Sequence, residues 1–288
     1  WVWLPGAAAP VVAGQVARDP ASGVIAFGYG RSYLDRPEAI ALFEPDLPLM
    51  PGLQAPRRGH LLAPCLRDAL PDRWGRRVIV NEILGHRGAE IREDGLGEMT
   101  FMLRSGSDRI GALDFQASAT EHVPRTGEEA TLEELQDFAD RVEAGLPVPP
   151  ALDRVILHGS SIGGARPKAL ITDRARGQPR KLIAKFSATN DVFAMVKAEF
   201  AAMRLTRHEG VGIDAAPVEL TKVQGRDVLL VERFDRVAVS AGWQRRGLVS
   251  ALSWTGDDEL AAHHIAYTEL AGIIRARFTA PGATLHEL

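Results

Sequence analysis

Short apolar runs broken by glycine and proline characterise the first 115 residues of the chain. The run at residues 24–29 predicts a strand, and residues 111–115 predict a second one. Between residues 64 and 84 the apolar positions instead follow helical spacing. Pro71 interrupts this spacing, so two helices are expected there rather than one.

A capping box marks the next helix. Thr131 and Glu134 have the Thr-x-x-Glu spacing in which the two side chains satisfy each other's backbone amides, so a helix is expected to begin after Thr131. The proline-rich stretch Pro147–Pro150 follows that helix and provides the best candidate for a domain boundary. Residues 1–147 are therefore predicted to form one N-terminal subdomain.

Beyond this boundary the pattern predicts strands. Residues 153–158 are expected to form a strand ahead of a glycine-rich turn. Residues 168–172 and 181–186 predict a hairpin with a polar tip, and residues 218–221 and 227–232 predict a second hairpin around Gly225. The two hairpins favour a small antiparallel sheet.

Helices are expected between and after these hairpins. Residues 190–208 predict a helix because their apolar positions form a stripe. The stripe consists of Val192, Met195, Val196, Phe200, Met203 and Leu205. Residues 257–278 predict a further helix in the tail. The predicted fold class is α+β.

Composition narrows the class of protein. The chain is 45% hydrophobic and 25% charged, as in an ordinary globular protein. Its formal net charge of −3 provides no overall basic field for nucleic acid or a membrane surface. Cys65 is the single cysteine, which excludes an internal disulfide and a cysteine-based zinc site. The apolar runs are too short for a bilayer, so a cytoplasmic location without membrane contact is expected.

The order of chemically informative residues is typical of the small lobe of a protein kinase. The stretch Gly159–Ala165 can bring backbone amides close to a phosphate chain, because glycine lacks a Cβ. Lys185 lies inside a predicted apolar strand, where its ammonium would meet the α- and β-phosphates of a nucleotide. Glu199 lies on the following predicted helix and would orient that lysine.

Each of these signals has a plainer explanation when taken alone. The glycine-rich turn also suits an ordinary hairpin, and a lysine in a strand usually lies on a solvated face. Glu199 also suits an exposed helix position. Only the order and the spacing of the three features favour a nucleotide site.

Four segments resemble the HipA family of serine/threonine protein kinases, the toxins of type II toxin–antitoxin systems. Residues 161–170 (SIGGARPKAL) are similar to the family's glycine-rich segment, and residues 231–236 (VERFDR) to its hinge strand. Residues 70–76 (LPDRWGR) and 108–115 (DRIGALDF) resemble two signatures of its N-terminal subdomain. The resemblance runs in the same order along the chain from about residue 70 to residue 236.

The resemblance implies a fold and a set of domains. Residues 1–147 would be the HipA-type N-terminal subdomain, and residues 151–240 would be the kinase-like small lobe with its glycine-rich loop and hinge. Residues 241–288 would begin the α-helical large lobe.

The resemblance also implies roles for named residues, with ATP and Mg²⁺ as cofactors. Lys185 would contact the ATP phosphates and pair with Glu199, and Ser161 would be the serine that is autophosphorylated. Arg166 and Lys168 would belong to a mobile loop near the phosphates, and the backbone from Val231 to Phe234 would meet the adenine. The expected cofactor-binding residues are Ser161, Ile162, Gly163, Gly164, Ala165, Lys168, Lys185, Glu199, Val231, Glu232 and Phe234.

The sequence departs from the family in one respect. A kinase needs an aspartate that orients the substrate hydroxyl, followed by an asparagine and a second aspartate that bind metal. Asparagine occurs only at Asn81 and Asn190, both before the hinge, and the only aspartates after residue 235 are Asp257 and Asp258. The catalytic and metal-binding residues are therefore expected to lie outside this chain, which alone would be inactive.

Three functions remain open at this point. The first is a kinase toxin that phosphorylates a protein of the translation machinery, of the aminoacyl-tRNA synthetase type, and whose remaining lobe is not in this sequence. A HipB-like helix-turn-helix antitoxin would hold it and would supply its only link to DNA. The second is a truncated, non-catalytic module that binds nucleotide or antitoxin. The third is a small-molecule kinase of related fold.

Overall fold

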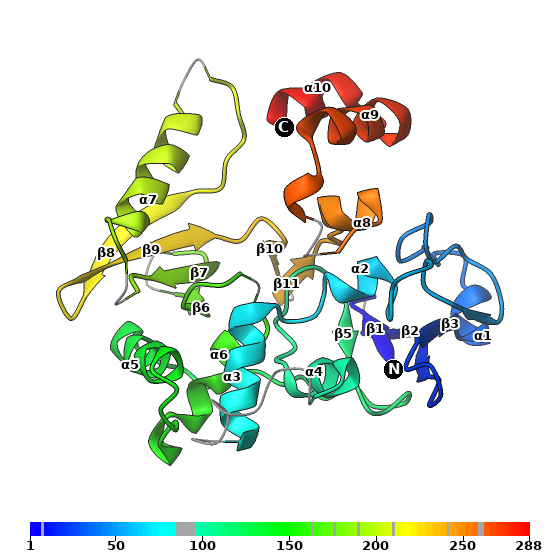
Figure 1. Ribbon diagram of the computed structural model, residues 1–288, viewed down its shortest axis with the longest axis horizontal. Coiled ribbons are helices and arrows are strands. Elements are labelled where there is room, and N and C mark those ends of the chain that lie inside the picture. The colour runs from blue at the N-terminus through cyan, green and yellow to red at the C-terminus, as the bar shows by residue number, and fades with distance from the viewer. Residues whose placement is uncertain are drawn as a thin grey trace. The chain divides into compact units, whose positions relative to one another are not determined.

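The computed structural model describes residues 1–6, 9–84, 96–162, 164–174, 177–188, 191–208, 211–240, 242–258 and 262–288. They form an α+β fold, which confirms the predicted fold class (Figure 1). By contacts the chain divides into two units. Unit 1 comprises Trp1–Ala69, Ala117–His122 and Gly247–Leu288, and unit 2 comprises Leu70–Gln116 and Val123–Arg246. The boundaries expected near residues 147 and 240 remain predictions.

Unit 1 contains an antiparallel sheet in the order β4-β3-β2-β1. The strands are β1 (Val2–Leu4), β2 (Val11–Arg18), β3 (Ile25–Tyr29) and β4 (Leu53–Gln54). The prediction of a strand at residues 24–29 is confirmed by β3. The short helices are α1 (Arg31–Leu34) and α2 (Pro64–Arg67), followed by α8 (Ala251–Thr255), α9 (Tyr267–Arg277) and α10 (Pro281–Glu287) in the tail.

Side-chain contacts within unit 1 join its early residues to its tail. Asp68 accepts hydrogen bonds from Ser250 N at 2.7 Å, from Ser250 Oγ at 2.6 Å and from Ser253 Oγ at 2.8 Å. Trp254 lies between two aromatic rings, with centroids 4.8 Å from Phe43 and 5.4 Å from Phe278. Helix α8 is therefore held at its N-terminus by a carboxylate and on its side by aromatic packing.

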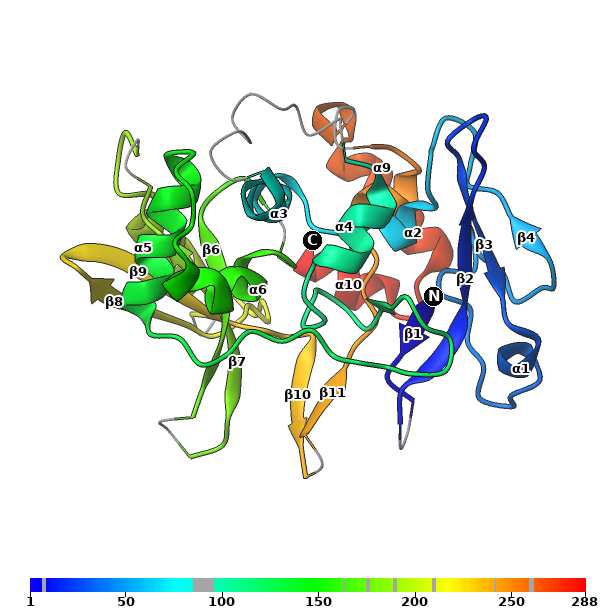
Figure 2. The same ribbon diagram turned by 90° about the horizontal axis from the view of Figure 1, so that it is seen from below.

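Unit 2 is built on a second antiparallel sheet, in the order β6-β7-β9-β8. Its strands are β6 (Lys168–Asp173), β7 (Arg180–Phe186), β8 (Val218–Val223) and β9 (Arg226–Glu232), which confirms both predicted hairpins. A separate hairpin of β10 (Arg236–Val239) and β11 (Gly242–Arg245) follows (Figure 2).

Helices cover both faces of this sheet (Figure 1). On one face α3 (Arg73–Leu84), α5 (Leu132–Glu143) and α6 (Ile156–Gly159) pack on alternate strand residues such as Ala184 and Phe186. On the other face α7 (Met195–Thr206) packs on Leu229 and Val231 through Val196 and Phe200. The two-residue alternation of the strands thus gives β7 one side for the main core and one side for α7.

Several predicted helices are confirmed. Helices α2 and α3 are separated near Pro71, and Thr131 caps α5 in a capping box with Glu134. Helix α4 (Glu98–Arg104) and strand β5 (Asp114–Phe115) complete unit 2, and β5 confirms the strand expected at residues 111–115. Among the described residues, no helix combines the length and the apolar character needed to cross a membrane.

The strand expected at residues 153–158 is wrong. This segment is a 3₁₀ helix over Pro150–Val155 that continues into α6. Consecutive residues Val155 and Ile156 are both buried, which suits a helix wedged between other helices rather than an alternating strand. Gly159 lies so close to α5 and α3 that a Cβ there would be 3.2 Å from Phe138.

Two predicted helices begin later than expected. Helix α7 starts at Met195 rather than near residue 190, because the Asp191 carboxylate accepts a hydrogen bond from Ala188 N at 3.0 Å and does not cap a helix. Val192 is consequently 92% exposed. In the tail, Ala266 is extended and the main helix, α9, starts only at Tyr267.

Candidate functional site

Lys185 on strand β7 and Glu199 on helix α7 are in contact within unit 2. Lys185 is the cross-strand partner of Leu229, so it lies on the face of the sheet that α7 covers. On α7, Glu199 follows buried Val196 by three residues and therefore points to the same side. Lys185 Nζ donates a hydrogen bond to Glu199 Oε1. The structure thus brings together the two residues that the sequence paired, and both side chains are half-buried.

The glycine-rich segment is partly buried. Ser161 and Ile162 are 3% and 2% exposed, whereas Gly164 and Ala165 are exposed. Gly163 lies outside the described residues. Gly164 has a φ of +97°, and a Cβ there would overlap the Lys168 ammonium. Only glycine fits this position without strain.

The Ser161 hydroxyl lies inside the protein in this conformation. It is next to Gly106, where a Cβ would be 3.3 Å from Ser161 Oγ. Within the described ranges, Ser161 Oγ has no hydrogen-bond partner. Modification of this serine would therefore require the segment to move outward, and its role stays a prediction.

Residues at the N-terminus of α3 are hydrogen-bonded to the glycine-rich segment. Trp74 N donates to Gly164 O at 2.9 Å, and the buried Trp74 Nε1 donates to Lys168 O at 2.9 Å. Gly164 N in turn donates to Asp72 Oδ2. Gly75 permits the close approach, because a Cβ there would lie 3.0 Å from Ser160 O. The LPDRWGR segment thus contacts the glycine-rich segment directly, and the sequence did not reveal this contact.

Lys168 is the first residue of β6 and is 7% exposed, so it belongs to the sheet and not to the loop. It is the cross-strand partner of Lys185. Burial lowers the pKa of the Lys168 ammonium to about 8; Asp72 acts against this and nearby Lys185 adds to it. Arg166 pairs with Asp191 at 2.5 Å. Two lysines and an arginine therefore gather at this end of the sheet.

The expected hinge lies at the end of β9. Val231 is buried beneath α7, and Phe234 is 64% exposed. The amides of Glu232 and Arg233 donate to Pro217 O and Lys181 O, both at 2.9 Å, so the sheet already uses them. Of the four residues from Val231 to Phe234, whose backbone is predicted to meet the adenine, Phe234 is the one with a largely exposed side chain.

A buried ion network anchors this hinge, and sequence analysis missed it. Asp108 Oδ1 accepts from Arg233 Nη1 at 3.0 Å and from Arg236 Nε at 3.1 Å, and its Oδ2 accepts from Lys181 Nζ at 2.8 Å. Arg233 and Arg236 also donate to Asp235 Oδ2, each at 2.8 Å. Both ends of the network lie in segments that resemble family signatures, which was the one available signal.

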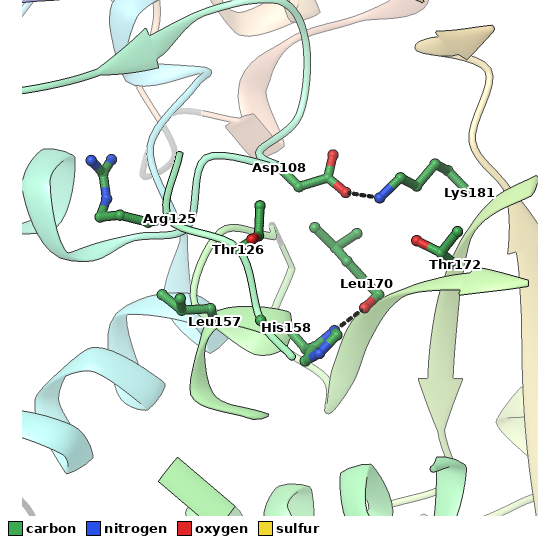
Figure 3. A pocket seen from close by; sticks show the side chains of 9 residues that line it. Asp108, Arg125, Thr126, Leu157, His158, Leu170, Thr172 and Lys181 are labelled. Atoms are coloured by element: carbon green, nitrogen blue, oxygen red, sulfur yellow. Dashed lines mark hydrogen bonds and ion pairs between the residues drawn. The ribbon is translucent and has the colours of Figure 1, made fainter. Parts of the chain in front are cut away.

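The network sets the protonation of Asp108. Burial would raise the pKa of this carboxyl, but Arg233, Lys181 and Arg236 outweigh burial and lower it to about 2. Asp108 and Lys181 also line a small cavity of about 70 Å³ with His158 and Leu170 (Figure 3). That volume suits a few water molecules and is too small for a nucleotide.

In the part of the chain that the structure describes, no group of three or more His, Cys, Asp or Glu residues has the arrangement of a metal site. The candidate site combines the cations Lys168, Lys185 and Arg166 with the carboxylates of Asp72, Glu199 and Asp191. Such a set suits a phosphorylated ligand.

In comparisons with known proteins, the N-terminal and the C-terminal parts of the chain each match a family model. Residues 2–116 match the family model for the HipA N-terminal domain, and residues 160–288 match the model for the HipA-like C-terminal domain. The search of curated proteins found no match.

A solved structure is also similar to this chain. It is the complex of HipA, HipB and operator DNA from the toxin–antitoxin system of Shewanella oneidensis MR-1. The sequences are 21% identical and the TM-score is 0.56. The match covers 86% of this chain and 55% of that one, so this chain spans about half the length of its structural relative.

Proposed function

The chain belongs to the HipA family, and from that premise we propose that it forms the ATP-binding part of a serine/threonine protein kinase toxin. The observation that carries the proposal is the Lys185–Glu199 ion pair. A strand lysine held by a helix carboxylate is the arrangement that kinases use to position nucleotide phosphates. Lys185 is half-buried in this arrangement, so its charge remains accessible to a ligand.

Each residue of the site has a defined task in this proposal. Lys185 binds the α- and β-phosphates, and Glu199 keeps its ammonium oriented. Gly164 lacks a Cβ and offers a backbone amide, which in this structure donates to Asp72. Lys168 adds a second ammonium at the same end of the sheet. Bound MgATP would supply the phosphoryl group and the metal charge that neutralises it.

Catalysis needs residues beyond these. Phosphoryl transfer depends on positioning of the hydroxyl and on metal binding, and the sequence offers neither the aspartate nor the asparagine for those tasks. We expect the 288-residue chain to bind ATP and to transfer no phosphoryl group.

Ser161 is proposed as the site of autophosphorylation. Because the hydroxyl is buried, the segment must swing outward before it can be modified. A phosphate adds about −1.5 to −2 charges at neutral pH, which cannot return to that buried position without a partner. Phosphorylation would therefore keep the segment out of the site.

The proposed partners follow from the family. The structural relative is a HipA–HipB–operator DNA complex, and we propose a HipB-like helix-turn-helix antitoxin for this chain as well. DNA contact would occur through the antitoxin, since the net charge of −3 gives this chain little affinity of its own. The proposed substrate is a protein of the translation machinery, of the aminoacyl-tRNA synthetase type, in the cytoplasm.

The test is an ATP titration of wild type and Lys185→Ala by calorimetry. We expect the alanine variant to lose at least about tenfold in affinity, the effect of a phosphate-binding charge. Lys197→Ala is the matched control, because Lys197 is an exposed lysine on the same helix as Glu199 and pairs instead with Asp227, at 3.3 Å. Equal affinity in wild type and Lys185→Ala would refute the site. Nucleotide binding without transfer in a longer form of the protein would favour a non-catalytic module instead.

A further inference from the structure

The Asp72 carboxylate lies where the glycine-rich segment would receive a phosphate. Its Oδ2 accepts the hydrogen bond of Gly164 N, the amide at the exposed, positive-φ end of the segment. The Lys168 ammonium is close by, since it occupies the space that a Cβ on Gly164 would fill. One anion therefore already interacts with both groups.

The same two groups are suited to a phosphate oxygen. Backbone amides of glycine-rich turns and lysine ammonium groups are the donors that hold phosphates in nucleotide sites. Each Gly164 amide hydrogen makes one strong hydrogen bond, so a carboxylate and a phosphate oxygen compete for it. Their negative charges also repel each other at short distance.

The remaining contacts of the segment do not compete in this way. Trp74 donates to two carbonyl oxygens, Gly164 O and Lys168 O, and leaves the Gly164 amide untouched. These two bonds can persist while the amide changes partner. The α3 N-terminus thus combines a permanent hold through Trp74 with an exchangeable one through Asp72.

Only one of the two carboxylate oxygens of Asp72 accepts a hydrogen bond from the described residues. Among the residues that the structure covers, its second oxygen, Oδ1, is shielded from solvent and has no hydrogen-bond partner. A shielded carboxylate oxygen without a donor is unfavourable. An incoming phosphate that takes over the amide would allow Asp72 to turn toward water.

We propose that Asp72 is a built-in competitor of the nucleotide, a carboxylate that occupies the phosphate position on Gly164 and must be displaced when ATP binds. This inference rests on the proposed function, because it assumes that the glycine-rich segment binds phosphates. It assigns to the LPDRWGR segment a regulatory contact that sets how tightly the empty site is closed.

The test compares the wild-type chain with Asp72→Asn, using ATP and inorganic tripolyphosphate as probes in calorimetry. Asparagine keeps an acceptor for the Gly164 amide and removes the charge, so the segment keeps its shape while its competitor weakens. We expect both probes to bind about tenfold more tightly to Asp72→Asn, as loss of a like charge at contact distance allows. Asp137→Asn is the matched control, because it makes the same change at an exposed position whose hydrogen bond from Gln224 can be retained.

Each outcome has one meaning. Unchanged or weaker binding of both probes by folded Asp72→Asn overturns the inference, while the proposed function stands if wild type binds ATP and Lys185→Ala does not. Absence of ATP binding in both wild type and Asp72→Asn overturns both proposals. If Asp72→Asn does not fold, Asp72→Ser serves the same comparison, with circular dichroism as the check of folding.

Discussion

Two groups of ion pairs in unit 2 differ in how far they are removed from water. The side chains of Lys185 and Glu199 remain 31% and 39% exposed. Those of Arg233, Asp235 and Arg236 are 1%, 4% and 2% exposed, and that of Asp108 is 25% exposed. The first group is one pair between a strand and a helix, and the second is a network in which every charge has several partners.

The difference separates a site that can change partners from one that cannot. An ion pair that stays in contact with solvent contributes about 0–1 kcal/mol to stability, so a ligand can replace one member at little cost. A buried network is strongly interdependent, because the loss of one charge leaves its partners uncompensated in a low-dielectric interior. The Lys185–Glu199 pair thus suits binding, and the Asp108–Arg233–Asp235–Arg236 network suits rigid anchoring of the hinge.

Removal of Asp108 should have the largest effect. Asp108→Ala leaves Arg233, Arg236 and Lys181 without their shared acceptor, and we expect a loss of about 3–5 kcal/mol in the free energy of unfolding. Urea denaturation followed by circular dichroism measures it. Asp137→Ala, at an exposed position of the same unit, should change stability by less than about 1 kcal/mol. Similar losses in both variants would show that the Asp108 network contributes no more to stability than an exposed carboxylate does.

Acid should have the second-largest effect, because it weakens the buried network. The pKa of Asp108 is lowered from 3.8 to about 2 in the folded chain, so its contribution to stability is fully present above about pH 4. As the pH falls from about 4 to about 2, Asp108 becomes protonated and about 2 kcal/mol is lost. Urea denaturation at a series of pH values should show this slope in wild type and a shallower one in Asp108→Asn. Identical slopes would show that Asp108 is not the group responsible.

The half-buried Lys185–Glu199 pair should contribute least to stability. Glu199→Gln keeps the shape of the side chain and removes its charge, and we expect a change of no more than about 1 kcal/mol in the free energy of unfolding. The same urea experiment measures this value. A loss of several kcal/mol would mean that the pair is part of the framework and not a site kept for a ligand.

The pattern of apolar and polar residues along the chain predicted the strands and helices that depend on neighbouring residues. The apolar run of residues 181–186 predicted a strand with Lys185 inside it, and in the structure Ala184 and Phe186 lie on the core side while Lys185 lies on the α7 side with Glu199. The Thr131 capping box specified the start of α5. The segment before the glycine-rich turn was misjudged, since its short apolar run suits a strand as well as a buried helix.

Contacts between distant segments were beyond the reach of such patterns. Asp72 meets Gly164 across 92 residues, and Asp108 meets Arg233 across 125. In the sequence each is an ordinary charged residue next to turn formers, and only the folded chain shows which donors it meets. The resemblance to family signatures marked both segments as important without indicating the contact that each one makes.

Thermal unfolding of wild type and Lys185→Ala, each with and without MgATP, tests most directly whether the Lys185–Glu199 pair binds a ligand while the Asp108 network anchors the hinge. We predict nearly equal unfolding temperatures for the two proteins without nucleotide, because the half-buried pair keeps its contact with solvent and contributes little to stability. MgATP at about 100 times its dissociation constant should stabilise wild type by about 2.7 kcal/mol and leave Lys185→Ala almost unchanged. Equal stabilisation of both proteins, or a large drop in the unfolding temperature of Lys185→Ala without nucleotide, would contradict the assignment of Lys185 to a nucleotide site.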